Sequence, residues 1–293
     1  MMLAPALLAG RDRYERRMQG RIDSLHDDAL THTVRIEDDD RALEALVVAL
    51  PPPAYEIREA RLVPRRGRVA GSVVAGFATL AGVAMVGGLT RRTAEALGDG
   101  EGAALAVDAM IEVARLARQV TRMPREEPAR AAGDPLAYWQ LDMVGWADLP
   151  NSCFTYSEAG RALFGTRTIA SAAVPELYSP RPGQRGVFER RKLAWLERAD
   201  GGLRLFHSMH DNVHGFELTV EVDLASGRIT RAEHVTPRLP YMGLCSEPQR
   251  RFATLAGEIV DAGLRKRIQA AVGGPEGCAQ LYDLTSDLLK LLT

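Results

Sequence analysis

The histidines of this chain are concentrated in one short segment. Three of the six lie in the stretch His207-Ser-Met-His-Asp-Asn-Val-His214, which also holds the carboxylate of Asp211. An imidazole changes charge near neutral pH, and a neighbouring carboxylate can hold its tautomer and tune its pKa. The alternative is a purely structural His–Asp pair. The catalytic interpretation predicts acid–base roles for His210, His214 and Asp211, with His207 and Tyr241 as further candidates.

The same side chains raise the question of a metal. Three imidazoles and a carboxylate are a possible ligand set for a divalent ion. Their spacing matches no compact metal-binding motif, so we interpret the sequence without a metal or any other cofactor. A metal-dependent hydrolase or lyase stays open as an alternative.

The cysteines suggest a nucleophile less strongly. Cys278 follows Gly277 at an expected helix start, where the helix dipole favours a thiolate. Free cysteine is more often a small buried apolar residue, and that interpretation is preferred for Cys245 and Cys278. The three cysteines of the chain cannot all pair with one another and form no Cys-x-x-Cys unit. Reduced thiols and a cytoplasmic location are therefore expected.

Two parts of the chain repeat each other. The segment Phe77-Ala-Thr-Leu-Ala-Gly82 recurs letter for letter at 252–257, and residues 77–116 share 16 of 40 positions with residues 252–291. Upstream, Tyr14-Glu-Arg-Arg17 aligns with Phe188-Glu-Arg-Arg191. Similar segments in a constant register indicate internal repeats. The sequence thus predicts an α+β fold with an internal tandem duplication, the copies lying at 14–116 and 188–291.

Each copy has the pattern of about four antiparallel strands followed by two or three helices. In the second copy, β-rich or alternating runs fall at 190–197, 203–210, 216–223 and 228–235, between turn residues. Apolar residues between Phe252 and Gly263 lie on one helical face, and a second stripe comprises Leu281, Leu284, Leu288 and Leu291. Gly263 and Gly273 are expected to mark helix ends.

These elements predict how the histidines are placed. If Asp211 and Asn212 form a hairpin tip, His210 and His214 flank it on adjacent strands and can approach across the pair. His207 then points to the opposite face from His210, because successive side chains alternate across a strand. The first copy lacks most of these imidazoles, so the working site is expected in the second copy.

The segment between the copies has no partner in either. We divide the chain into a first lobe at 14–125, an aromatic-rich insert at 126–187 and a second lobe at 188–293. The aromatic residues of the insert could simply anchor it across both lobes by burying apolar area. The functional alternative is a lid or wall over an apolar pocket. That alternative predicts substrate-binding roles for Trp139, Trp146, Tyr156 and Tyr178.

Composition argues against several classes of partner. The chain has 37 basic and 38 acidic side chains and a formal net charge of -1, which gives no reason to expect nucleic acid or an anionic membrane as a partner. Residues 69–89 are long and apolar enough to suggest a membrane span. Their counterpart at 244–264 carries several charges, so we expect a buried helix at 69–89, more enclosed than its twin.

The second copy resembles a known family. Its motifs are His210-Asp211, Pro240-Tyr241-x-x-x-Cys245, Leu255-Ala-Gly257 and Gly273-Gly-Pro-Glu-Gly-Cys278-Ala-Gln-Leu281. In this order they resemble an uncharacterised bacterial family, a domain of unknown function, over about the last hundred residues. Gln280 stands where the family's motif has His, which puts any role of that imidazole in doubt here. The resemblance implies a bacterial, cytoplasmic protein and supplies no reaction.

Three functions remain open. The leading hypothesis is a cofactor-independent lyase that uses His–Asp acid–base chemistry on a small aromatic compound, as in aromatic catabolism. It is favoured because nucleophile, redox and nucleotide motifs are absent from the sequence. A non-catalytic ligand-binding or assembly module and a metal-dependent enzyme are the alternatives. The expected partner is a small aromatic ligand, and a homodimer is possible.

Overall fold

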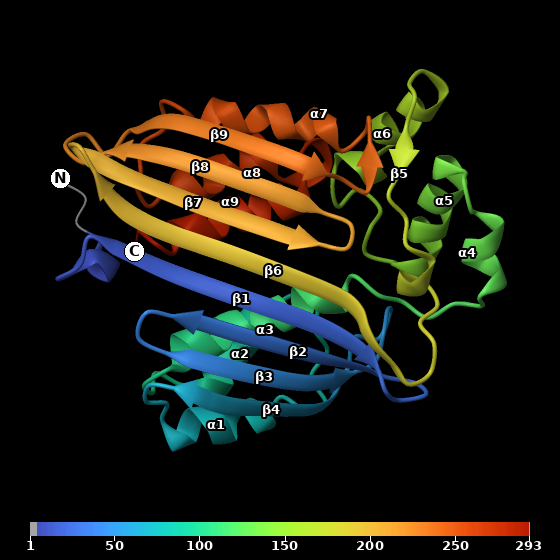
Figure 1. Ribbon diagram of the computed structural model, residues 1–293, viewed down its shortest axis with the longest axis horizontal. Helices are drawn as coiled ribbons and strands as arrows, with labels where there is room; N and C mark the ends of the chain where they lie inside the picture. Colours follow the sequence, from blue (N-terminus) through green and yellow to red (C-terminus); the bar gives the residue numbers. More distant parts are fainter. Residues whose placement is uncertain (1–4, 293) are drawn as a thin grey trace.

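The computed structural model, which describes residues 5–292, is built on one long antiparallel sheet (Figure 1). Its strand order is β4-β3-β2-β1-β6-β7-β8-β9, and a separate two-stranded sheet pairs β10 with β5. The strands are β1 (Arg13–Ser24), β2 (Leu30–Asp38), β3 (Ala42–Ala49), β4 (Ile57–Arg66), β5 (Ala170–Ser171), β6 (Gln184–Ala199), β7 (Gly202–Asp211), β8 (Gly215–Asp223), β9 (Ile229–Arg238) and β10 (Tyr241–Met242).

Helices cover one face of this sheet. The α-helices are α1 (Gly71–Ala78), α2 (Leu89–Leu97), α3 (Ala103–Ala117), α4 (Glu126–Arg130), α5 (Pro135–Gly145), α6 (Glu158–Ala162), α7 (Ser246–Gln249), α8 (Leu264–Val272) and α9 (Ala279–Leu289). Short 3-10 helices are η1 (Ala6–Leu8), η2 (Phe154–Tyr156), η3 (Leu163–Gly165), η4 (Pro175–Leu177), η5 (Arg250–Leu255) and η6 (Gly274–Glu276). In Figure 1, α1–α3 and α7–α9 lie behind the strands of their own halves. The mixed helix and sheet composition that the sequence predicts is confirmed.

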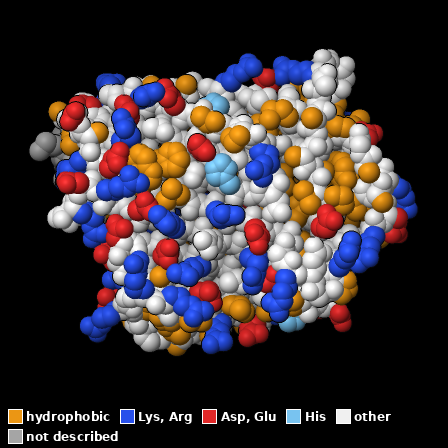
Figure 2. Space-filling view, viewed as in Figure 1, with side chains coloured by type: hydrophobic (Ala, Val, Ile, Leu, Met, Phe, Trp, Pro, Cys, Tyr) orange, Lys and Arg blue, Asp and Glu red, His pale blue; other side chains and the backbone are white. Residues whose placement is uncertain are grey.

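The strands of the second half show why alternating apolar and polar residues predicted them. Along β8, Phe216, Leu218, Val220 and Val222 are buried, whereas Glu217, Thr219 and Glu221 alternate with them and are more exposed. Such alternation places one apolar face toward the helices and one polar face toward water. All four strands predicted in this half are present. Figure 2 views the uncovered face, where basic and acidic side chains are interspersed.

In the second half, the helices predicted after Gly263 are confirmed, and the helix predicted between Phe252 and Gly263 is wrong. The stripe of Leu281, Leu284, Leu288 and Leu291 is buried, and α8 lies between Gly263 and Gly273 as predicted. A helix does not continue from Phe252 to Gly263, because the backbone turns away after η5. The Gly257 N–H instead donates to the Ile229 carbonyl at 2.8 Å, so this stretch pairs with the start of β9.

The equivalent stretch in the first half behaves in the same way. Within the apolar run 69–89, α1 covers only 71–78 and α2 begins at Leu89, so the expected long buried helix is wrong. The buried residues of α1 are Val73 and Phe77. The Gly82 N–H donates to the Ile57 carbonyl at 2.7 Å and thereby pairs with the start of β4. Among the described residues, no helix is long and apolar enough to cross a membrane.

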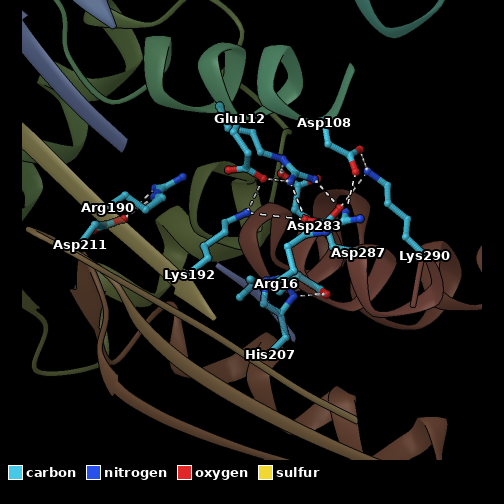
Figure 3. A network of polar contacts seen from close by, with 12 residues as sticks. Arg16, Asp108, Glu112, Arg190, Lys192, His207, Asp211, Asp283, Asp287 and Lys290 are labelled. Carbon is cyan, nitrogen blue, oxygen red and sulfur yellow. Dashed lines mark hydrogen bonds and ion pairs between the residues drawn. The ribbon is translucent and has the colours of Figure 1, made fainter. Parts of the chain in front are cut away.

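Charged side chains join the two halves beneath the centre of the sheet, where β1 pairs with β6 (Figure 3). Arg115 of α3 contacts Asp283 and Asp287 of α9 at 3.0 and 2.6 Å. Lys290, just after α9, contacts Asp108 of α3 at 2.6 Å. Buried Lys192 on β6 bonds Glu112 of α3 at 2.8 Å. These crossed ion pairs fix α3 against α9.

The insert packs at one end of the sheet, at the right of Figure 1, where α4, α5, α6 and β5 gather. Asp134 caps α5 by accepting hydrogen bonds from the backbone N–H groups of Leu136 and Ala137, and Pro135 occupies the first turn. The Trp139 indole N–H donates to the Thr155 carbonyl at 2.8 Å and ties α5 to η2. These bonds fix α5 within the insert.

Candidate functional site

A cavity of about 160 Å³ lies between the insert and the second half of the sheet. Its walls come from α5, η2, β10, the β7–β8 turn and the beginning of α9. Five aromatic side chains line it: Trp146, Tyr156, Tyr178, Phe216 and Tyr241. An apolar cavity of about 150 Å³ holds benzene in another protein, so this volume suits one aromatic ring.

One wall of the cavity carries a carboxylate among three tyrosines. Tyr178 donates to Asp142 Oδ1 at 2.5 Å, Tyr156 donates to Oδ2 at 2.8 Å, and Tyr241 also donates to Oδ2. Burial raises the pKa of Asp142 to about 6, although the three hydroxyl groups each act to lower it. This carboxyl group can therefore exchange a proton close to neutral pH.

The lining also includes His214, which is held by Asp211. The turn after β7 places the backbone N–H groups of Val213 and His214 at 2.8 and 2.6 Å from Asp211 Oδ1. The same carboxylate lies 3.1 Å from His214 Nδ1. An ionised carboxylate accepts hydrogen bonds only, so Nδ1 carries a proton, and the neutral form of this imidazole has its lone pair on Nε2. The His214 side chain that carries this nitrogen lines the cavity.

Asp211 is kept ionised by Arg190. The Arg190 guanidinium lies 2.7 Å from Asp211 Oδ2, and both side chains are fully buried (Figure 3). Burial alone would raise the pKa of Asp211, but His214 and Arg190 together hold it well below its usual range. An ion pair between Arg190 and Asp211 and a hydrogen bond between Asp211 and His214 thus connect the sheet interior to the cavity.

The other predicted histidines lie elsewhere. His210 is on the uncovered face of the sheet, with its side chain 41 % exposed and its Nε2 3.3 Å from Glu217. His207 is buried on the opposite face, as predicted, and its Nδ1 lies 2.9 Å from the Leu284 carbonyl. The three imidazoles therefore do not converge. No group of three His, Cys, Asp or Glu side chains that could hold a metal occurs among residues 5–292.

The predicted substrate-binding residues are split in the same way. Trp146, Tyr156 and Tyr178 line the cavity together with Tyr241, whereas Trp139 does not line it. Trp139 packs behind this wall, with its ring centroid 6.4 Å from that of Tyr156 and 6.1 Å from that of Phe164. Its position supports the wall instead of contacting the cavity. The roles assigned to all these residues stay predictions.

All three cysteines line the cavity as free thiols. Cys245 is hydrogen-bonded to the Thr155 hydroxyl, with 2.9 Å between Sγ and Oγ1. Burial raises the pKa of the Cys245 and Cys153 thiols and raises that of Cys278 to about 11. Since the thiolate is the nucleophile, these side chains form part of an apolar wall at neutral pH.

Comparison with known proteins gives a family match for the second half of the chain. Residues 199–292 match the family described as "Protein of unknown function (DUF2889)". The predicted resemblance to a family of unknown function over the last third of the chain is confirmed. No curated protein and no solved structure matches the chain.

The DUF2889 match covers only part of the cavity. It contains Asp211, His214 and Tyr241, but it excludes Asp142 and Arg190. The sequence interpretation missed the latter two residues. Arg190 belongs to the noted Phe188-Glu-Arg-Arg191 motif, but nothing in that motif indicated a buried partner. Asp142 gave no signal beyond its place in an aromatic-rich insert.

Proposed function

We propose that the protein is a lyase that acts on a small aromatic compound by His–Asp acid–base chemistry. The observation that carries the proposal is the position of His214, which is held by ionised Asp211 and lines an aromatic cavity. General bases are recognised by this combination of an oriented imidazole and a site for the reacting group.

The proposed roles follow from the residues of this cavity. His214 Nε2 takes a proton from the bound compound, and Asp211 stabilises the imidazolium that results. Asp142, with its pKa near 6, exchanges the second proton. The electron pair left by the removed proton forms a double bond as a carbon–carbon or carbon–oxygen bond of the compound breaks, and the leaving group takes up the second proton. The proposed step uses only these side chains and requires no cofactor.

A ligand-binding module is the second candidate. It is favoured by the structural use of Asp211, whose Oδ1 accepts two backbone N–H groups and closes the β7–β8 turn. In that case His214 shapes the cavity and no bound compound changes chemically. A metal-dependent hydrolase or lyase has less support, because His207, His210 and His214 face different surroundings.

The test compares two histidine variants. His214→Ala should lower kcat/KM at least about a hundredfold on any single-ring substrate found by mass spectrometry, the usual scale for loss of a general base. His210→Ala is the matched control, since His210 lies on the same hairpin but outside the cavity, and it should retain activity within about twofold. Equal activity of the two variants would refute the proposal.

We also infer that the two halves arose by duplication. Besides the repeated sequence, equivalent side chains make equivalent contacts. Arg92 donates to the Ala84 carbonyl at 3.0 Å, and Arg267, 175 positions later, donates to the Ile259 carbonyl at 2.5 Å. The crossed ion pairs of α3 and α9 support the same inference. A single-copy relative that assembles as a homodimer with this eight-stranded sheet would test it.

The lobe boundaries and a cytoplasmic location also stay proposals. The free thiols of Cys153, Cys245 and Cys278 support a reducing compartment. Cell fractionation of the tagged protein would test the location, and recovery outside the cytoplasm would contradict it.

A further inference from the structure

The charges around the cavity indicate what kind of ligand it accepts. Among the described residues that line it, Arg118, Asp142 and His214 are the side chains that can carry a charge near neutral pH. Burial holds the pKa values of the lining cysteines and tyrosines above their usual range, so these groups stay neutral. Arg118 and His214 each lie beside a carboxylate, that of Asp148 and that of Asp211, so the ligand's charge preference depends chiefly on Asp142.

Arg118 is already committed to other partners. Its Nε donates to Asp148 at 3.0 Å, its Nη1 to the Ala114 carbonyl at 3.0 Å, and its Nη2 to the Met85 carbonyl at 3.1 Å. Its guanidinium also lies 4.9 Å from the centre of the Tyr55 ring. Three of its five N–H donors have partners, and Asp148 balances its charge, so Arg118 adds no uncompensated positive charge to the cavity.

Asp142 retains capacity to accept one more hydrogen bond. A carboxylate offers about four acceptor positions on its two oxygens, and three are taken by tyrosine hydroxyl groups. Oδ2 accepts from Tyr156 and Tyr241, whereas Oδ1 accepts from Tyr178 alone. The Asp142 side chain lines the cavity, and the residue is 5 % exposed. A proton donor in the cavity can therefore bond Oδ1.

We propose that the ligand of this cavity is a neutral single-ring phenol whose hydroxyl group donates to Asp142. The volume selects one ring, the aromatic walls select an apolar body, and the Asp142 carboxylate selects a donor and repels an anion. This inference names the substrate class of the proposed function and rests on the same cavity being its binding site. It does not depend on the role of His214.

The test uses three probes of similar size: phenol, toluene and benzoate. Toluene replaces the hydroxyl of phenol by a methyl group, and benzoate adds a negative charge. Affinities measured by calorimetry or ligand-observed NMR at pH 8 should be about tenfold higher for phenol than for toluene, as expected for a hydrogen bond to a charged group. Benzoate should bind more weakly than toluene.

Two variants identify the responsible group. Asp142→Asn should reduce the preference for phenol over toluene to less than about threefold. Its affinity for toluene should stay within about threefold of the wild-type value. Tyr178→Phe removes the donor that competes at Oδ1 and should preserve or increase the phenol preference. It also keeps the test valid if Asp142→Asn does not fold.

The inference is overturned if benzoate binds more tightly than phenol, or if phenol shows no preference over toluene. Loss of the phenol preference in Tyr178→Phe would also overturn it. These outcomes are separable from failure of the proposed lyase. If phenol is preferred over toluene but no turnover is found, the ligand class stands and the proposed lyase fails. If turnover depends on His214 but phenol is not preferred, only the ligand class is refuted.

Discussion

Removing Arg190 should destabilise the protein strongly, because it would leave a buried charge without its partner. The Arg190–Asp211 pair is 2.7 Å apart and both side chains have zero exposure. At an effective dielectric constant of about 20, two unit charges at this distance attract by about 6 kcal/mol. The desolvation cost of the guanidinium, which Arg190→Met no longer incurs, offsets part of this attraction. We therefore expect a loss of about 3–5 kcal/mol in the free energy of unfolding at pH 7.

The assay is urea unfolding followed by tryptophan fluorescence. Arg191→Ala is the control, since the next residue on β6 is exposed, and it should change the free energy of unfolding by less than about 0.5 kcal/mol. The folded-state pKa of Asp211 is lowered, so its stabilisation is present above its unfolded pKa near 4 and is lost as the pH falls below that value. The difference in the free energy of unfolding between Arg190→Met and the wild type should thus become smaller toward pH 3. A loss below about 1 kcal/mol at pH 7 would refute this reasoning.

Three further predictions concern buried groups. Burial lowers the pKa of His207 to about 4, so the unfolded chain binds a proton that the folded chain rejects between pH 6.5 and 4. Between pH 6.5 and 4, the free energy of unfolding of His207→Gln should fall by roughly 3 kcal/mol less than that of the wild type. Urea titrations at several pH values would show this. The three thiols should react slowly with an alkylating reagent in the folded protein at pH 8 and rapidly in urea, by mass spectrometry; fast labelling of Cys245 in the native state would contradict its raised pKa. Gly160→Ala should weaken phenol binding by displacing η2, because a Cβ there would lie 2.1 Å from the Phe154 carbonyl oxygen; unchanged affinity would contradict the role of η2 as a cavity wall.

Much of the sheet was predictable, because a strand with one buried face alternates apolar and polar residues in the sequence. β8 shows this directly, with Phe216 and Leu218 facing the helices and Glu217 facing water. Helix ends were predicted where glycine marks them, as at Gly263 and Gly273. The predicted helix through Gly257 was wrong, because its backbone hydrogen bond to Ile229 competes with helix continuation. That partner lies in a distant strand and leaves no periodic signal.

The site was only partly predictable for a similar reason. Asp211 and His214 are neighbours in one turn, so their contact could be expected from sequence. Arg190 reaches Asp211 across the paired strands β6 and β7, a register that the motif does not encode. Asp142 meets Tyr178 and Tyr241 only after α5 and β10 come together. Its acid–base character arises from that burial and not from its local sequence.

The central claim is that the cavity lined by His214 and Asp142 is the ligand site. The most direct measurement is a crystal structure of the protein soaked with phenol at saturating concentration. The ring is predicted to occupy this cavity, with its hydroxyl oxygen within hydrogen-bonding distance of Asp142 Oδ1. Phenol bound elsewhere while only water occupies the cavity would contradict the claim.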